Sequence, residues 1–399
     1  MIRHVSQKLR AATVNRRGFL KLAGAAGLLS VAGGLDGILV ARQAQAQVDA
    51  IQPGQWFEIP NSRLDAVLPD PLPQVGYGDP SAIMAAWSGG AYDSLRDRLI
   101  VWGGGHGNYS GNEVYAFQLA TRAWVRLTDP SPTTLFLVEP SQDVNPDGTP
   151  VARETYGGLQ YLPNVDRFWA SGGSRWWDGD DVWDIWTFDL GPRRWQPGPR
   201  PVDSGLGVVS DYDPVTGHVF FHGYTDLVEY DPVTTLQTIL TMPGTEPSFD
   251  DTNAGVIDPR RRRFIVIGTG VVAGAGRGLS WYDLTQKPPL LSPDLQPLLG
   301  DTGFVSLTAP GVGFTVPGVA YSPTVDRVVV WGGGTDIWTV NLDTWLCLKH
   351  PPAPGSAVPT PIEPNGTYGR WRYVPSLDLF IGVNRTNENV YLYRLPTDV

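Results

Sequence analysis

One segment of the chain, residues 92–127, recurs along its length and constrains the fold more than any other feature. Its sequence, YDSLRDRLIVWGGGHGNYSGNEVYAFQLATRAWVRL, predicts a polar turn, an apolar strand, a glycine-rich loop, a second strand, another turn and a short strand opened by Trp124. The first half of this pattern returns without a gap at five further places, which begin at Tyr161, Tyr212, Ile257, Tyr321 and Tyr373. Six registered copies at irregular separations predict a repeat architecture with loops of variable length.

The two ends of the repeat region predict how this architecture closes. A four-stranded unit cannot bury both of its faces alone, so neighbouring copies must pack on one another. The sixth copy runs out of chain after its third strand, Asn389 to Leu395, and lacks an outer strand. Residues 55–60 (QWFEIP) have an outer-strand pattern but no unit of their own. Pairing these two segments would satisfy both edges. The sequence therefore predicts an all-β fold, a six-bladed β-propeller closed by an N-terminal strand.

Residues 1–46 carry the pattern of an export signal, which leaves residues 47–399 as a single six-bladed propeller. Residues 15–21 (NRRGFLK) form a twin-arginine signature, small and apolar residues follow as far as Leu35, and residues 44–46 (AQA) fit a cleavage site. The alternative is a membrane anchor, but the apolar run is short against the roughly 20 residues that span a bilayer. We therefore expect a periplasmic or secreted protein exported by the twin-arginine pathway.

Net charge and cysteine content limit the classes of partner and the chemistry that we expect. The chain has a formal net charge of −10, and removal of seven Lys/Arg and one Asp with residues 1–46 gives −10 − 7 + 1, or −16. This charge opposes nucleic-acid binding and repels polyanions unless cations gather locally. The single cysteine, Cys347, excludes an intramolecular disulfide and lies in an apolar strand, where we expect a buried, inert thiol. We expect a monomer that binds a polysaccharide or other glycan and, once the signal is removed, no membrane.

The copies also resemble a known repeat. In the first two copies, an apolar strand ends in two glycines, and an aromatic residue is followed after six residues by a tryptophan, Phe117 to Trp124 and Phe188 to Trp195. This pattern resembles the kelch repeat of galactose-oxidase-like propellers, although copies three, four and six depart from the double glycine. The resemblance implies the fold and is nearly silent on activity. Copper-radical chemistry would need a Tyr–Cys crosslink near the axis, and the outer-strand position of Cys347 disfavours it.

Loop lengths predict where a ligand site lies. The turn between the first and second strands is constant in all six copies, whereas connections on the opposite face vary, as in residues 128–150, 285–313 and 350–364. Long connections in a compact domain are often functional. We therefore expect a ligand site on the long-loop rim, around the axial channel.

Four residues from consecutive copies map to this rim and form the candidate catalytic set: His106, Tyr156, Arg175 and His222. The set resembles the His/Tyr/Arg sites of propeller-fold polysaccharide lyases of the ulvan-lyase type. That resemblance implies β-elimination from a uronic-acid-containing polysaccharide. Arg175, or Arg153 in its place, would neutralise the uronate carboxylate, and Tyr156 and His106 would exchange protons with the substrate. His222 would orient the substrate or help to hold a metal.

Aromatic and acidic residues near the same rim suggest a substrate-binding surface. In residues 176–183 (WWDGDDVW), tryptophan faces could stack on sugar rings while carboxylates accept hydroxyl hydrogen bonds. The same aspartates could bind calcium, and ordinary packing of a loop is an equal alternative. Candidate metals are therefore calcium or zinc. The predicted substrate-binding residues are Asn108, Tyr109, Arg153, Trp176, Trp177, Asp178, Tyr368 and Arg370.

Each candidate residue also has a structural interpretation. Thr155-Tyr156-Gly157 recurs as Thr367-Tyr368-Gly369, and Trp87 aligns with both tyrosines, which favours a repeated structural aromatic. The histidines would then be hydrogen-bonded loop anchors, and the arginines surface charges. A polysaccharide lyase is the leading function, and a non-catalytic glycan- or protein-binding kelch propeller is the alternative. Whether the protein is an enzyme stays open at this point.

Overall fold

The computed structural model describes residues 46–73, 78–105, 107–132, 143–240, 253–269, 277–287, 289–292, 295–308 and 316–397. By its contacts the chain divides into two units, residues 1–51 and residues 52–399. All strands described below belong to the second unit. The twin-arginine signature lies outside the described residues. Among those that are described, no helix is both long and apolar enough to cross a membrane.

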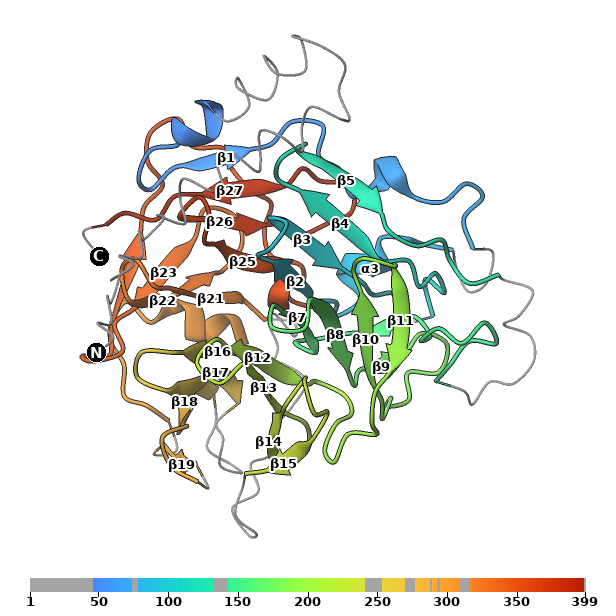
Figure 1. The fold of residues 1–399 in the computed structure, drawn as a ribbon. Helices are drawn as coiled ribbons and strands as arrows, with labels where there is room; N and C mark the ends of the chain where they lie inside the picture. The colour runs from blue at the N-terminus through green and yellow to red at the C-terminus, as the bar shows by residue number, and fades with distance from the viewer. Residues whose placement is uncertain are drawn as a thin grey trace, which may run out of the picture. The chain divides into compact units, whose positions relative to one another are not determined.

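Six sheets, each containing four antiparallel strands, make up most of the second unit (Figure 1). We call them blades 1 to 6 in the order in which their inner strands follow along the chain. Blade 1 contains β2 (Gly90–Asp93), β3 (Arg98–Val101), β4 (Tyr115–Gln118) and β5 (Ala123–Arg126). Blade 2 contains β7 (Leu159–Leu162), β8 (Arg167–Ser171), β10 (Ile185–Asp189) and β11 (Arg194–Pro197). Blade 3 contains β12 (Val209–Asp213), β13 (His218–His222), β14 (Leu227–Tyr230) and β15 (Gln237–Ile239).

The remaining three blades follow the same plan. Blade 4 contains β16 (Ala254–Asp258), β17 (Arg263–Thr269), β18 (Arg277–Asp283) and β19 (Leu290–Leu291). Blade 5 contains β21 (Gly318–Ser322), β22 (Arg327–Trp331), β23 (Ile337–Val340) and β24 (Leu346–His350), and β20 (Leu299–Gly300) adds a parallel strand outside β24. Blade 6 contains β25 (Trp371–Val374), β26 (Leu379–Gly382), β27 (Tyr391–Tyr393) and β1 (Trp56–Glu58).

The inner strands of the six blades contact one another in a closed ring, in the order β2, β7, β12, β16, β21, β25 and back to β2. Figure 1 shows these strands around a common centre with the outer strands at the periphery. The predicted six-bladed β-propeller is confirmed. Short elements outside the blades include β6 (Arg153–Glu154), which pairs with β9 (Ser174–Arg175), the helix α3 (Ala82–Ala85), and the 3-10 helices η2 (Leu64–Val67), η4 (Gly303–Thr308) and η5 (Tyr368–Arg370).

Strand β1 closes the ring, as the sequence predicted for residues 55–60. It pairs antiparallel with β27, with Trp56 opposite Tyr393 and Glu58 opposite Tyr391. The Trp56 side chain is 1% exposed, and its ring lies 5.4 Å from that of Trp331 and 5.6 Å from that of Trp371. The first strand of the propeller thus carries a core residue of the last blade.

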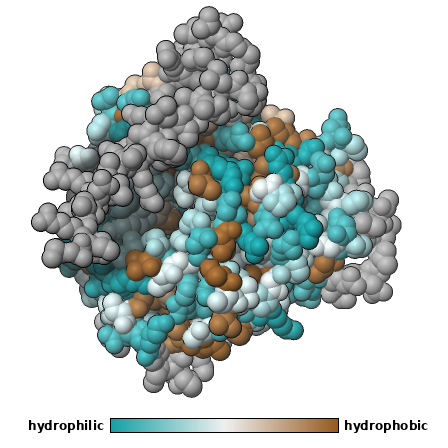
Figure 2. Space-filling model, in the orientation of Figure 1, coloured by the Kyte–Doolittle hydropathy of each residue, from teal (hydrophilic) through white to brown (hydrophobic). Residues whose placement is uncertain are grey.

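Apolar side chains between the blades form the core. Cys347 is fully buried among them, and burial raises the pKa of its thiol to about 11, in agreement with the predicted inert cysteine. On the face shown in Figure 2, hydrophobic side chains are scattered among hydrophilic ones wherever the described residues are visible.

In four of the six blades, the turns between first and second strands share a hydrogen bond. The tyrosine that opens the repeat donates from its hydroxyl to an aspartate five residues later, at distances of 3.0, 2.9, 2.6 and 2.7 Å in the pairs Tyr92–Asp97, Tyr161–Asp166, Tyr321–Asp326 and Tyr373–Asp378. We call this end of the propeller the turn end, and the opposite end the loop end.

Ion pairs at the turn end join neighbouring blades. Arg96 of blade 1 pairs with Asp166 of blade 2 at 2.6 Å, and Arg262 of blade 4 pairs with Asp213 of blade 3 at 2.5 Å. Arg261 of blade 4 reaches both Asp326 and Asp343 of blade 5. Each of these contacts resists separation of two blades, because the partners belong to different sheets.

Candidate functional site

One position of the inner strand varies between blades in a way that matters chemically. It is the residue directly before the repeated tyrosine, or before Ile257 in blade 4. In three blades it is small or apolar, and in the other three it is polar. The six residues, from blade 1 to blade 6, are Ala91, Gln160, Asp211, Val256, Ala320 and Arg372.

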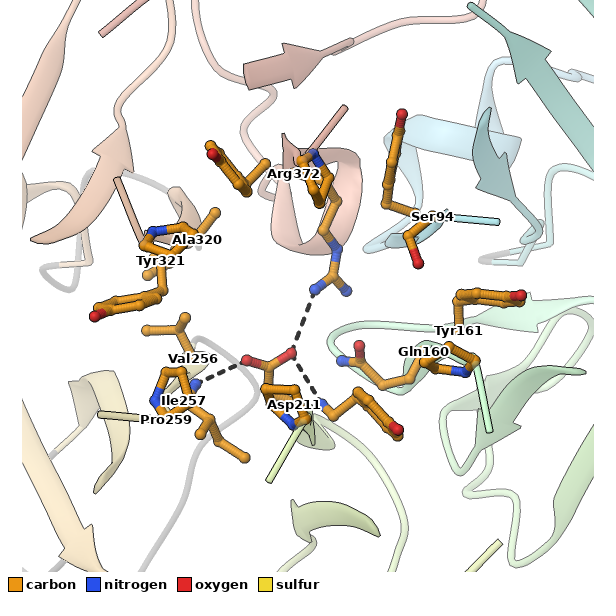
Figure 3. Close-up of a pocket in the computed structure, with 18 residues that line it drawn as sticks. Ser94, Gln160, Tyr161, Asp211, Val256, Ile257, Pro259, Ala320, Tyr321 and Arg372 are labelled. Carbon is orange, nitrogen blue, oxygen red and sulfur yellow. Dashed lines mark hydrogen bonds and ion pairs between the residues drawn. The ribbon is translucent and has the colours of Figure 1, made fainter. Parts of the chain in front are cut away.

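The three polar residues lie around a cavity of about 420 Å³ at the turn end of the axis (Figure 3). This volume is within the range of roughly 300–1,000 Å³ that is typical of small-molecule sites. All six blades contribute to the cavity, and its walls are mainly the repeated tyrosines and the prolines of the turns. The wall residues are Tyr92, Tyr161, Tyr212, Tyr321, Tyr373, Pro163, Pro214, Pro259, Pro323 and Pro375, with Ser94 where blade 1 lacks the proline.

The floor of the cavity is crossed by the side chain of Arg372. In Figure 3 it extends from blade 6 toward Asp211 of blade 3 on the opposite side. Its Nε donates to the Gly369 carbonyl at 3.1 Å, and its Nη2 donates to the carbonyls of Gly90 at 3.0 Å and Leu159 at 3.2 Å. Nη1 lies 3.6 Å from Asp211 Oδ1. The guanidinium is thus fixed by blades 1, 2 and 6, while Nη1 faces the carboxylate.

Backbone donors fix the Asp211 carboxylate. Its Oδ2 accepts from the Ile257 amide at 2.7 Å, and its Oδ1 accepts from the Tyr212 amide at 3.0 Å. Burial is the largest influence on this group and raises its pKa, although Arg372 and the two amides act in the opposite direction. Gln160 completes the polar floor, with its Nε2 donating to the Ser210 carbonyl at 2.8 Å.

The channel narrows behind this floor. The next cavity along the axis measures only about 20 Å³ and is lined by small residues of the inner strands together with Tyr368 and Arg372. Beyond it Tyr156 and Tyr368 pack edge to face with ring centroids 5.8 Å apart, in a cluster that also contacts Trp87. These three aromatics have positive φ angles of 46°, 47° and 45°, which are outliers for bulky residues. Aromatic packing therefore fills the loop end of the axis.

The predicted catalytic residues occupy the following places. His106 lies outside the described residues. Tyr156 is 2% exposed, and its hydroxyl donates to Glu154 Oε2 at 2.7 Å. Arg175 forms ion pairs with three carboxylates, at 2.7 Å to Asp143, 3.0 Å to Asp178 and 2.9 Å to Asp180. His222 is fully buried, and its Nδ1 lies 2.8 Å from the Gly223 carbonyl. All three described residues lie at loop ends of their blades, and their catalytic role stays a prediction.

The predicted substrate-binding residues are mostly engaged within the protein. Arg153 pairs with Asp184 through both of its terminal nitrogens, and the Tyr109 hydroxyl donates to Glu113. Arg370 is fully buried and donates to backbone carbonyls that include those of Met84, Gly366 and Val383, and burial lowers its pKa to about 10.

Five predicted substrate-binding residues remain to be placed. Trp176 is 5% exposed and lies edge to face with the half-buried Trp177, and Asp178 pairs with Arg175. Tyr368 belongs to the axial packing, and the Asn108 amide donates to the Gly105 carbonyl at 2.9 Å. A group of at least three His, Cys, Asp or Glu side chains suited to a metal does not occur among the described residues.

The cavity at the turn end is a site that the sequence analysis missed. The variable loops predicted a site on the opposite rim, and the repeated tyrosines and prolines belong to turns whose length is constant in all six copies. The available signal was the residue before each tyrosine, where Gln160, Asp211 and Arg372 depart from their apolar equivalents.

The burial of His222 gives a prediction for stability against pH. Burial lowers the pKa of this imidazole from 6.5 to about 4, so the unfolded chain binds a proton between these values while the folded chain does not. Stability is therefore lost as the pH falls below about 6.5, by about 2 kcal/mol at about pH 5. His222→Gln should flatten the acid side of the stability profile in urea unfolding experiments. The control is His218→Gln on the same strand, where the histidine side chain is 28% exposed. This variant should lose stability at acidic pH as steeply as the wild type does. Equal profiles for the wild type and His222→Gln would contradict this account.

Comparison with known proteins was made by sequence and by structure. No family model matches the chain, and no curated protein matches it by sequence. Among solved structures, the chain is similar to the crystal structure of TolB from Acinetobacter baumannii, with 16% sequence identity and a TM-score of 0.40. The match covers 68% of this chain and 55% of that chain.

Proposed function

We propose that this propeller is a glycan-binding protein and that it holds a sugar in the axial cavity at the turn end. The observation that carries the proposal is the pairing of a donor and an acceptor on the cavity floor, Arg372 and Asp211, inside walls of tyrosine and proline rings. Ligand pockets typically combine such apolar walls with a few fixed polar groups.

The floor suits hydroxyl groups. A hydroxyl both donates and accepts, so one sugar hydroxyl, or two adjacent ones, can accept from Arg372 Nη1 and donate to the Asp211 carboxylate. The separation of 3.6 Å between these groups is longer than a direct hydrogen bond, so neither group is saturated by the other. With one cation and one anion, the floor favours a neutral sugar over a uronate, whose additional negative charge would face Asp211.

The walls suit the apolar face of a sugar ring. Four of the five wall tyrosines have their hydroxyls bonded to turn aspartates, so they offer mainly their ring surfaces to the cavity. Aromatic rings of this kind combine a large apolar surface with low loss of conformational entropy on binding.

A bulky side chain at the mouth tests the proposal. Ser94 is exposed and lines the cavity, whereas its neighbour Leu95 is 65% exposed and lies outside the cavity lining. We expect Ser94→Trp to weaken binding to neutral glycans at least tenfold by filling the mouth, and Leu95→Trp to bind as the wild type does. The measurement is a glycan array followed by titration calorimetry. Equal affinity of both variants, or no glycan bound by the folded protein, would overturn the proposal.

Asp211→Asn supplies a second test. A hydrogen bond to a charged group contributes about 1.5–3 kcal/mol, so loss of the carboxylate charge should weaken binding about tenfold to a hundredfold. Because burial raises the pKa of Asp211, wild-type affinity should also fall on acidification at a higher pH than the ordinary aspartate value of about 4. Asp178→Asn, at the loop end, should have no effect if the sugar binds at the turn end.

A second candidate function is β-elimination from a uronic-acid polysaccharide at the loop end. The half-buried Trp177 favours it, because an aromatic ring can stack on a sugar and the Arg175 guanidinium lies 5.7 Å from the centre of this ring. Incubation with uronic-acid polysaccharides should then raise the ultraviolet absorbance of unsaturated chain ends. Tyr156→Phe should lower this rate about a hundredfold. No rise in absorbance with any such polymer would exclude the lyase.

A further inference from the structure

We infer that the axial site takes the terminal sugar of a glycan chain and not an internal segment. This inference rests on the proposed function and adds to it the part of the glycan that is recognised. It follows from the number of openings of the cavity.

Along the axis, the residues that the structure describes leave little space behind the floor of the cavity. Arg372 crosses its floor, and the space behind the floor measures only about 20 Å³. Farther along, Tyr156 and Tyr368 are 2% and 3% exposed and pack against each other. A sugar that reaches Asp211 therefore cannot continue toward the loop end.

Between the blades, the described inner strands leave no exit from the cavity. The inner strands contact their neighbours around the whole ring. Backbone hydrogen bonds support several of these junctions near the axis, as between the Tyr156 amide and the Trp87 carbonyl at 2.6 Å, and between the Gly157 amide and the Val208 carbonyl at 2.9 Å. Arg372 itself bonds to carbonyls of blades 1 and 2. The turn end is the one opening that the described residues leave.

A cavity with a single opening limits which part of a polysaccharide can reach its floor. An internal sugar of a chain carries a glycosidic bond on each side, so to reach Asp211 it would need both neighbouring segments to turn back through the same opening. A terminal sugar needs one way out, through which the rest of the chain can leave past the tyrosines and prolines of the mouth. Branches and lengthening of the chain then lie in solvent and leave the contacts with Arg372 and Asp211 unchanged.

Comparison of cyclic with linear glucans distinguishes recognition of a terminal sugar from recognition of an internal sugar. The probes are malto-oligosaccharides and cyclodextrins, which share sugar and linkage but differ in having ends, together with size-graded cello- and manno-oligosaccharides. We expect linear probes of at least one series to bind. The number of protein molecules bound per oligosaccharide should not rise with the length of the oligosaccharide. If malto-oligosaccharides are that series, the cyclodextrins should bind at least a hundredfold more weakly.

The outcomes are distinguishable. A number of bound protein molecules per oligosaccharide that rises with its length would overturn the terminal-sugar inference and leave the proposed glycan binding intact. Cyclodextrins that bind as tightly as linear malto-oligosaccharides would do the same. If none of the probes binds to the folded protein, both fail. Ser94→Trp should weaken the binding of linear chains at least tenfold, whereas Leu95→Trp should bind as the wild type does, which assigns the measured binding to this cavity.

Discussion

Replacement of Trp56 by alanine is expected to lower the free energy of unfolding by about 3–5 kcal/mol, the usual cost of truncating a buried tryptophan. Its ring packs on Trp331, Trp371, Tyr391 and Tyr393 within blades 5 and 6. The variant leaves a cavity beside the pairing of β1 with β27, which is the one strand that β1 pairs with in its sheet. Urea unfolding followed by tryptophan fluorescence and circular dichroism measures the change.

Phe57 provides the matched control on the same strand. It pairs opposite Leu392 but is only half-buried, and its ring lies 5.8 Å from the Arg122 guanidinium. Phe57→Ala should cost less than half as much as Trp56→Ala. Equal costs for the two substitutions would mean that strand pairing, and not the packing of Trp56, holds the ring closed.

Replacement of Arg261 by methionine is expected to lower the free energy of unfolding by about 3–5 kcal/mol, because it leaves the buried Asp258 carboxylate without its counter-charge. Arg261 is the centre of three ion pairs, at 3.0 Å to Asp258, 2.8 Å to Asp326 and 2.6 Å to Asp343. The Asp258 side chain is fully buried, so water cannot take the place of the guanidinium. Thermal and urea unfolding give the magnitude.

The adjacent Arg260 is the control for this substitution. Its side chain is 67% exposed and pairs with Asp326 at the surface, so Arg260→Met should cost less than about 1 kcal/mol. The hydrogen bond from Arg261 is also the main reason that the pKa of Asp326 falls to about 2. In Arg261→Met this pKa should rise toward the ordinary value of about 4, which nuclear magnetic resonance titration can follow. An unchanged pKa would contradict the proposed contact.

The fold could be predicted because the sequence motif of one blade is repeated six times. Six copies of the same turn fixed the strand register, and the missing outer strand of the last copy matched the unassigned segment around Trp56. A strand displaced by one residue would have put the repeated apolar positions on the wrong face. Such patterns depend on local sequence and need no knowledge of distant contacts.

The site was less predictable, because it depends on contacts between distant segments. The sequence cannot show that Asp143 joins Asp178 and Asp180 around Arg175, or that Arg372 reaches Asp211 across the axis. Trp87, Tyr156 and Tyr368 were correctly aligned as equivalent aromatics, but their packing at the loop end is a property of the closed ring. The cavity is located where that packing ends.

The pairing of β1 with β27 has a consequence for biosynthesis. The partner of Trp56 is Tyr393, so the first strand of the propeller leaves the ribosome long before the strand that it must join. Until then its apolar side chains and its open edge are exposed, a state prone to aggregation that chaperones usually protect. Contacts between such distant parts of a chain also form slowly. Premature termination that removes β27 should therefore be as damaging as loss of β1, because either truncation leaves the other strand without a partner.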